Sequence, residues 1–175
     1  MLIKHDIPVK FGNLPFGKLA ETITTEDSSI IILDEKQLKG LSHGYVTTVI
    51  LHEIIHALTV NALNNPKTKE ERVFAKSINK LTNKAKKLFN KYRQLDSDDV
   101  AYALSNEKEF AAMFITDDSI RTEILGLLNK DNSLLSTIKH FVNSLTKFLV
   151  NKNVFNTTEE KIKAAQKKFL HFLDS

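Results

Sequence analysis

Apolar side chains with helical spacing dominate the stretch that follows Tyr45, and this pattern constrains the fold more than any other feature. They recur at intervals of three and four residues until Asn64-Asn-Pro66 ends the pattern. The residues concerned are Val46, Val49, Ile50, Ile54, Ala57 and Leu58. The spacing predicts one helix that is buried over most of its surface.

The first forty residues carry a different signal, because three short runs have the alternation and the branched residues of strands. These runs are 7–11, 17–23 and 28–33. They predict a small mixed or antiparallel sheet. Since the run 28–33 comes just before the long helix, it is either an edge strand that could pair with an extended peptide or a plain core strand.

After the long helix the pattern is helical almost throughout. Thr68-Lys-Glu-Glu71 has the form of a capping box and predicts a helix from there to about Arg93, followed by a loop at 95–99. Further helices are expected at about 106–115, 118–129, 133–150 and 158–173, the last with a capping box at Thr157-Thr-Glu-Glu160.

The expected fold class is therefore α+β, with a small N-terminal sheet packed on a mostly helical body. A length of 175 residues predicts a single domain, 1–175. Within it we distinguish a strand-rich part at 1–40, a central helical part at 42–130 and a helical C-terminal part at 131–175.

Composition excludes several classes of protein. Hydrophobic residues make up 42% and charged residues 26%, which is ordinary globular usage. The absence of cysteine excludes disulfides and thiolate metal sites, so any metal must be bound by histidine, aspartate or glutamate. The sequence shows neither a signal peptide nor a membrane-spanning run, which leaves the cytoplasm or a virion as the expected locations.

The stretch from Lys67 to Arg93 is strongly basic, with ten Lys or Arg residues against two glutamates. A basic helix surface can attract nucleic acid. A solvated lysine-rich helix face is the favoured interpretation, because no nucleic-acid-binding motif accompanies the charge.

Within the apolar helix lies His52-Glu53-Ile-Ile-His56. Histidines four residues apart project from one helix face, close enough for both imidazoles to bind one cation at about 2.0 to 2.1 Å. At about 100° per residue, Glu53 falls beside them and points at water rather than at the metal. The alternative is a hydrogen-bonded core cluster, which costs about 1 to 3 kcal/mol for each imperfectly paired group. A metal site facing a cleft is favoured.

A catalytic zinc needs three protein ligands and an open position. The metzincin pattern would place a third histidine six residues after His56, where this chain has Ala62, so that branch is excluded and a downstream carboxylate is expected. The candidates are Glu70, Glu71, Glu107, Glu109 and Glu123, with Asp96, Asp98, Asp99, Asp117 and Asp118 less favoured.

Spacing alone separates these candidates only in part. Glu70 and Glu71 belong to a helix start and should be solvated. Glu109 is favoured weakly over Glu107, and it is also interpretable as a capping residue three positions after an Asn106 N-cap. Of the remaining histidines, His43 is the one substitute ligand worth checking, whereas His5, His140 and His171 are expected to be incidental.

Two segments together resemble a known class of enzyme. LHEIIHAL at 51–58 and YALSNEKEFAAMF at 102–114 are similar to the motifs of gluzincin-type zincin metallopeptidases, in particular the anthrax lethal factor catalytic domain and zincin domains of phage and mobile-element proteins. The resemblance spans about 42–130. It implies that Glu109 is the third zinc ligand and that Tyr102 assists catalysis.

One position departs from that family. Four residues after the ligand glutamate the family has an acid that orients a zinc-binding histidine, and this chain has Met113 there. Losing such a partner typically costs 10- to 100-fold in affinity or activity. Either Asp117, Asp118 or a backbone carbonyl replaces it, or the enzyme is weak.

The resemblance implies a zinc metalloendopeptidase in which His52, His56 and Glu109 hold Zn²⁺. Glu53 would be the base for a zinc-bound water, and Tyr102 would stabilise the oxyanion. The expected partner is a protein or peptide substrate, with no membrane, in a setting such as a phage virion or a larger polyprotein. The alternatives are a catalytically inert zincin-like virion module and a basic nucleic-acid-binding helical protein.

Overall fold

The computed structural model describes residues 7–26, 28–92, 98–128 and 135–151. These residues group into two compact units. The first comprises Ile7–Asn65 and Asp98–Thr122, and the second contains the other described residues. Each unit is treated by itself, and the single domain expected over 1–175 stays a prediction.

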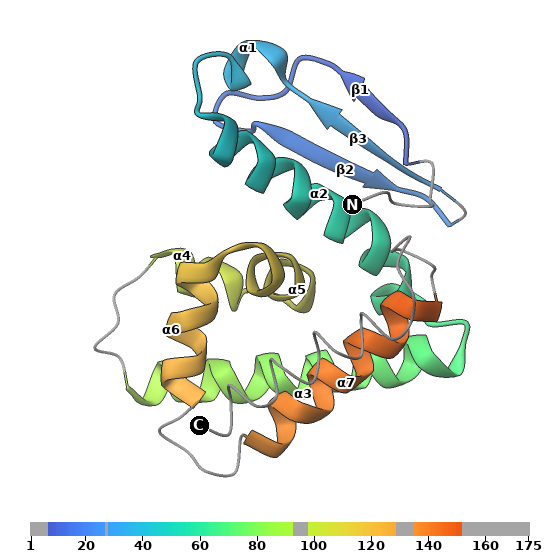
Figure 1. Ribbon diagram of the computed structural model, residues 1–175, viewed down its shortest axis with the longest axis vertical. Helices are drawn as coiled ribbons and strands as arrows, with labels where there is room; N and C mark the ends of the chain where they lie inside the picture. The colour runs from blue at the N-terminus through green and yellow to red at the C-terminus, as the bar shows by residue number, and fades with distance from the viewer. Residues whose placement is uncertain (1–6, 27, 93–97, 129–134, 152–175) are drawn as a thin grey trace. The chain divides into compact units, whose positions relative to one another are not determined.

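The sheet of the first unit has three strands, β1 (Val9–Phe11), β2 (Ala20–Thr24) and β3 (Ser29–Leu33). Their order is β1-β3-β2, with β1 parallel and β2 antiparallel to β3 (Figure 1). The strand at 28–33 is therefore central. Of the two alternatives for this run, the core strand is confirmed and the edge strand is wrong, because β3 has a strand on each side. Instead, β2 is an edge strand.

A short helix that the sequence pattern did not predict, α1 (Glu35–Leu38), follows β3 and anchors the loop before β2. The Asp34 side chain accepts hydrogen bonds from the backbone N–H of Leu14 and of Gln37 and from the Gln37 amide. The Gln37 amide donates in turn to carbonyl oxygens of the loop. These bonds, first among them the one from the Gln37 side chain, lower the pKa of Asp34 from 3.8 to about 2.

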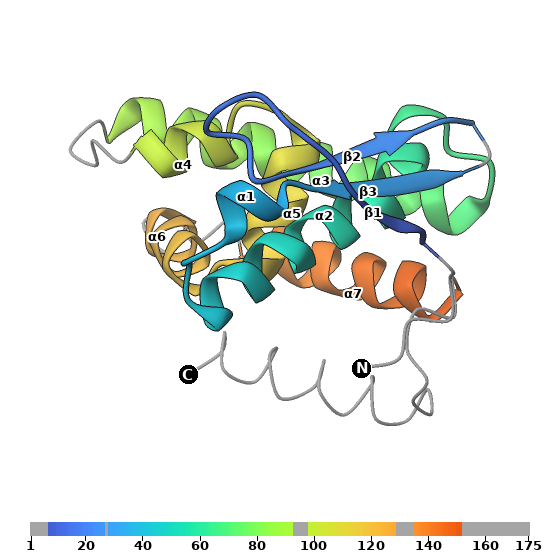
Figure 2. The same ribbon diagram turned by 90° about the horizontal axis from the view of Figure 1, so that it is seen from above.

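The long helix α2 (His43–Asn64) packs on β2 and β3, and α5 (Glu107–Thr116) packs against another side of α2 (Figures 1 and 2). Buried Ala20, Ile31 and Leu33 of the sheet meet partly buried apolar residues of α2. Hydroxyl and amide side chains add hydrogen bonds between the sheet and α2, one of them from Ser29 to the Ala57 carbonyl oxygen. The helix is thus held in place along its length.

By length and composition α2 is also apolar enough to cross a membrane, with a mean hydropathy of 1.4. The core helix of a soluble protein passes the same test, so this property is weak evidence for a membrane segment.

Three further helices follow, α4 (Asp98–Ala103), α5 (Glu107–Thr116) and α6 (Asp118–Leu128). The helices expected at 106–115 and 118–129 are confirmed. The predicted loop at 95–99 is wrong at its last two residues, because the helical turns of α4 already begin there and bury Val100 and Ala103. Its other residues lie outside the described part of the chain.

The second unit is built on α3 (Lys69–Lys91) and α7 (Leu135–Asn151), which pack against each other. The Phe74 ring of α3 stacks on Phe148 of α7, with centroids 4.6 Å apart. The predicted capping box is present, since Thr68 and Glu71 exchange hydrogen bonds between side chain and backbone. Glu71 is therefore buried, contrary to the expectation that it is solvated.

The α+β fold class is confirmed: a small N-terminal three-stranded mixed sheet precedes a body that is helical throughout its described part, with seven helices there. The helix expected at 158–173 lies outside the described residues, as do His5 and His171.

The Asp34 bonds predict a pH-dependent contribution to stability. Because the pKa of Asp34 is lowered in the folded protein, its contribution is present above pH 3.8 and is lost as the pH falls towards about 2. Asp34→Asn should therefore lower the urea midpoint at pH 7, and its difference from the parent should shrink over that acid range. Glu35→Gln removes an exposed neighbouring charge and should not shift the midpoint. A constant difference for Asp34→Asn would contradict the prediction.

Candidate metal centre

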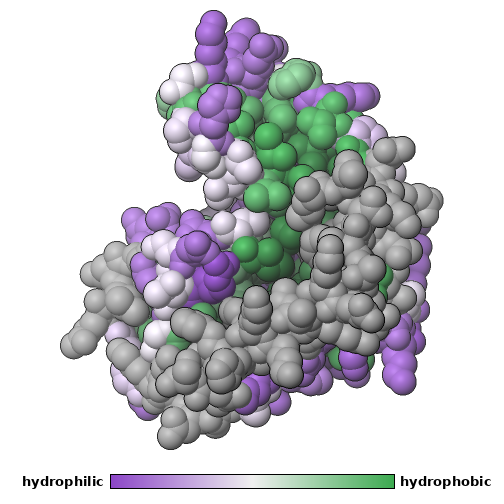
Figure 3. Space-filling model, in the orientation of Figure 1, coloured by the Kyte–Doolittle hydropathy of each residue, from purple (hydrophilic) through white to green (hydrophobic). Residues whose placement is uncertain are grey.

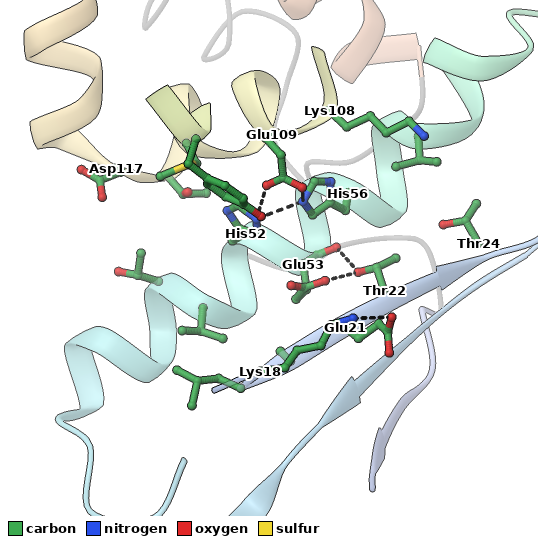
Figure 4. Close-up of a pocket in the computed structure, with 18 of the residues that line it drawn as sticks. Lys18, Glu21, Thr22, Thr24, His52, Glu53, His56, Lys108, Glu109 and Asp117 are labelled. Carbon is green, nitrogen blue, oxygen red and sulfur yellow. Dashed lines mark hydrogen bonds and ion pairs between the residues drawn. The ribbon is translucent and has the colours of Figure 1, made fainter. Parts of the chain in front are cut away.

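Two helices of the first unit bring together three side chains that are far apart in the sequence. α2 carries His52 and His56 one turn apart, and α5 packs across them with Glu109 in its first turn. The three ligand atoms all lie within 4.8 Å of one another, so the group is able to hold a metal ion (Figure 4). The convergence expected of His52, His56 and Glu109 is therefore present, and their roles stay predictions.

The distances within the group suit one small cation. The Nε2 atom of His52 lies 3.4 Å from Glu109 Oε2, that of His56 lies 3.5 Å from Glu109 Oε1, and the two Nε2 atoms are 2.9 Å apart. Ligand atoms at tetrahedral angles and bonds of about 2.0 to 2.1 Å lie about 3.3 to 3.4 Å from each other. The three donors therefore fit around one ion after small shifts of the imidazoles.

The Glu109 carboxylate is oriented for this role and not for capping α5. Asn106 caps the helix instead, since its side chain accepts the backbone N–H groups of Lys108 and Glu109. Burial alone raises the pKa of Glu109, but His52 and His56 overcome this effect and hold that pKa well below its usual range. Its buried Oε2 atom has no hydrogen-bond partner among the described residues, as expected of an oxygen that binds a cation.

Glu53 follows His52 on α2 but is not part of the metal group, which consists of His52, His56 and Glu109. Its carboxylate Oε2 accepts a hydrogen bond of 2.6 Å from the Thr22 hydroxyl on β2 (Figure 4). The residue is only 9% exposed, and Glu53 lines the same pocket as the metal group. The Glu53 carboxylate thus points toward Thr22 on β2, in the same pocket as the three donors and outside their group (Figure 4).

Tyr102 comes from α4 and lies at the mouth of the pocket, where it is 55% exposed. Burial of the hydroxyl and the negative charge of Glu109 raise the pKa of Tyr102 above its usual value. The phenol therefore keeps its proton at neutral pH and remains able to donate a hydrogen bond.

The metal group opens into a pocket of about 760 Å³. Its walls are β2 with the loop before it, one side of α2 along most of its length, and α4 with α5. In the space-filling view the surface is hollowed between α4 and the start of α2 (Figure 3). Side chains of His52, Glu109 and His56 are 21%, 18% and 11% exposed, so a small molecule can reach them.

The other proposed ligands are not in the metal group. Among the described candidates, Glu70, Glu71 and Glu123 belong to the second unit, and Glu107, Asp98, Asp99 and His43 lie outside the group. Asp96 lies outside the described residues.

Neither acid proposed to replace the one missing at Met113 bonds to a histidine. The Asp117 carboxylate accepts the backbone N–H groups of Ser119 and Ile120 at the start of α6. Asp118 pairs with Arg121. Both carboxylates are thus engaged by α6, while Met113 itself lines the pocket.

Thr22 is the one contact of the site that sequence reasoning missed. Threonine in an alternating strand is an ordinary residue, and no local pattern indicates that it will meet a helix 31 positions later. Only the pairing of β2 with β3, and the packing of both on α2, bring the two side chains together.

Comparisons of this chain with protein-family models, with curated proteins and with solved structures find no match.

Loss of the Glu109 carboxylate should abolish tight metal binding. With Zn²⁺ as the probe ion, Glu109→Ala should lower the affinity at least about 100-fold, because losing a ligand costs more than losing a residue that merely orients one. Glu107→Ala removes a carboxylate from the same helix turn and should bind Zn²⁺ like the parent. Competition with a coloured chelator measures both, and equal affinities for the two variants would contradict the assignment.

Proposed function

We propose that this chain is a zinc-dependent peptidase of the zincin class. The observation that carries the proposal is the convergence of His52, His56 and Glu109, with Glu53 held beside them in an open pocket. The resemblance of the segments 51–58 and 102–114 to gluzincin motifs supports the same function.

The donor set favours zinc over other common ions. Two imidazole nitrogens and one carboxylate, with no further carboxylate in the group, match the three-ligand pattern of catalytic zinc sites. Calcium and magnesium prefer sites built from oxygen atoms, and calcium takes six to eight of them. Bound at this site, Zn²⁺ supplies Lewis acidity, which acidifies a water molecule and polarises a substrate carbonyl.

Glu53 is the proposed general base. A base must lie within hydrogen-bond reach of the proton that it removes, and Glu53 is the residue next to His52 on the pocket side of α2. The carboxylate takes a proton from water as it attacks the peptide carbonyl and then transfers this proton to the leaving amine.

Tyr102 is the proposed donor to the negative charge that develops on the carbonyl oxygen. A tyrosine hydroxyl keeps its proton at neutral pH, and the position of Tyr102 on α4 puts it on the pocket wall with Glu109. Hydrogen bonds to such an oxygen strengthen in the transition state, so they raise kcat.

An extended peptide is the proposed substrate, and β2 is the strand that binds it. β2 is an edge strand and lines the pocket from Ala20 to Thr24, whereas β3 is covered on both sides. Backbone pairing along an edge strand holds a peptide without regard to its sequence.

The Glu53→Gln variant tests the base. It should bind Zn²⁺ like the parent and lose peptidase activity by about 100-fold or more, since general-base catalysis typically contributes 10²- to 10⁴-fold. Glu107→Gln is the matched control and should keep full activity. Cleavage of a quenched fluorescent peptide library reports turnover, and parent-like cleavage by Glu53→Gln would overturn the role of Glu53. A zinc-loaded parent that cleaves nothing would favour the inert zincin-like module, which Met113 already suggests.

The Tyr102→Phe variant tests the oxyanion donor. Removing one such donor typically costs about 10²- to 10³-fold in kcat, so kcat should fall strongly while KM and zinc content stay close to the parent values. Tyr92→Phe removes a hydroxyl outside the pocket and should leave kcat unchanged. An effect of Tyr102→Phe on KM alone would assign the hydroxyl to substrate binding instead.

A further inference from the structure

The Thr22 hydroxyl on the edge strand β2 has two acceptors on the same residue of α2. It lies 2.6 Å from the Glu53 carboxylate Oε2 and 2.9 Å from the Glu53 backbone carbonyl oxygen. A hydroxyl carries one hydrogen, so it donates to one acceptor at a time. The choice between them decides whether Thr22 only ties the strand to the helix or also fixes the Glu53 side chain.

The carboxylate is the stronger acceptor. Hydrogen bonds to an ionised oxygen are shorter and roughly twice as strong as those between neutral groups, and the shorter of the two distances is the one to the carboxylate. Thr22 and Glu53 are both at least half-buried, so the bond forms in a partly dehydrated setting where its strength is less reduced by water.

A second hydroxyl of the sheet also bonds to a backbone carbonyl oxygen of α2. On the neighbouring strand β3, the Ser29 hydroxyl donates to the Ala57 carbonyl oxygen one helical turn further along α2. Ser29 does not line the pocket. The sheet is therefore already joined to α2 by a hydroxyl that touches no carboxylate, and Ser29 isolates the structural effect of such a bond.

We propose that Thr22 is a positioning residue that fixes the Glu53 carboxylate within the pocket that the metal group also lines, by the hydrogen bond from its hydroxyl to Oε2. The proposal deepens the proposed function and rests on it. One carboxylate oxygen is engaged by Thr22, which leaves the other free to accept a proton from water. Glu53 is thereby held in one orientation before substrate binds.

Kinetics of the zinc-loaded protein test the effect on turnover. Thr22→Val keeps the shape of the side chain and removes the hydroxyl, and it should lower kcat about tenfold without changing KM or zinc content. Thr22→Ser retains the donor and should restore most of the loss. Ser29→Ala should leave kcat at the parent value. A parent-like kcat for Thr22→Val, or no rescue by serine, would overturn the proposal.

Unfolding of the metal-free protein tests the contact independently of activity. The stability lost on Thr22→Val is measured in urea twice, in the parent and in Glu53→Ala, which removes the carboxylate and keeps the backbone carbonyl. A bond to the carboxylate predicts a smaller loss in the Glu53→Ala background. Equal losses show that the hydroxyl serves the backbone alone and overturn the proposal, even if the protein is a peptidase. If the parent cleaves no peptide, the proposed function fails and this comparison alone decides whether Thr22 holds Glu53.

Discussion

The packing of α5 across α2 is the constraint on which the rest of the site depends. It sets a carboxylate 3.4 to 3.5 Å from two imidazole nitrogens that are already paired on one helix face. Such a cluster of polar donors is costly to bury unless a cation or a full set of hydrogen bonds satisfies it. The buried Glu109 oxygen lacks a hydrogen-bond partner among the described residues, and the three side chains together are able to hold a metal ion.

The sheet contributes to this site through its edge. Because β3 takes the central place, β2 lies along the pocket and presents Thr22 to the helix that carries the histidines. The same strand contacts the Glu53 side chain and forms one edge of the sheet, where the proposed peptide would pair. Support of the base and binding of a substrate would therefore depend on one strand.

The activity of the proposed enzyme would depend on what orients its histidines. This chain has Met113 at the position of the acid in gluzincin motifs, and Asp117 and Asp118 are engaged at the start of α6. An acid that orients a metal-binding imidazole raises its basicity and fixes its rotation. In this chain the hydrogen bonds and the ion pair of Asp117 and Asp118 are made with α6, so neither acid orients His52 or His56.

The sequence by itself determined what depends on local spacing. Three features follow from residues within a few positions of one another. They are the helical period around His52 and His56, the caps at Thr68 and Asn106, and the mixed α+β content. Only the tertiary structure decided the strand order and the contact of Thr22 with Glu53. These features depend on segments that are distant in the chain, and packing free energy, which no local pattern records, selects among their possible arrangements.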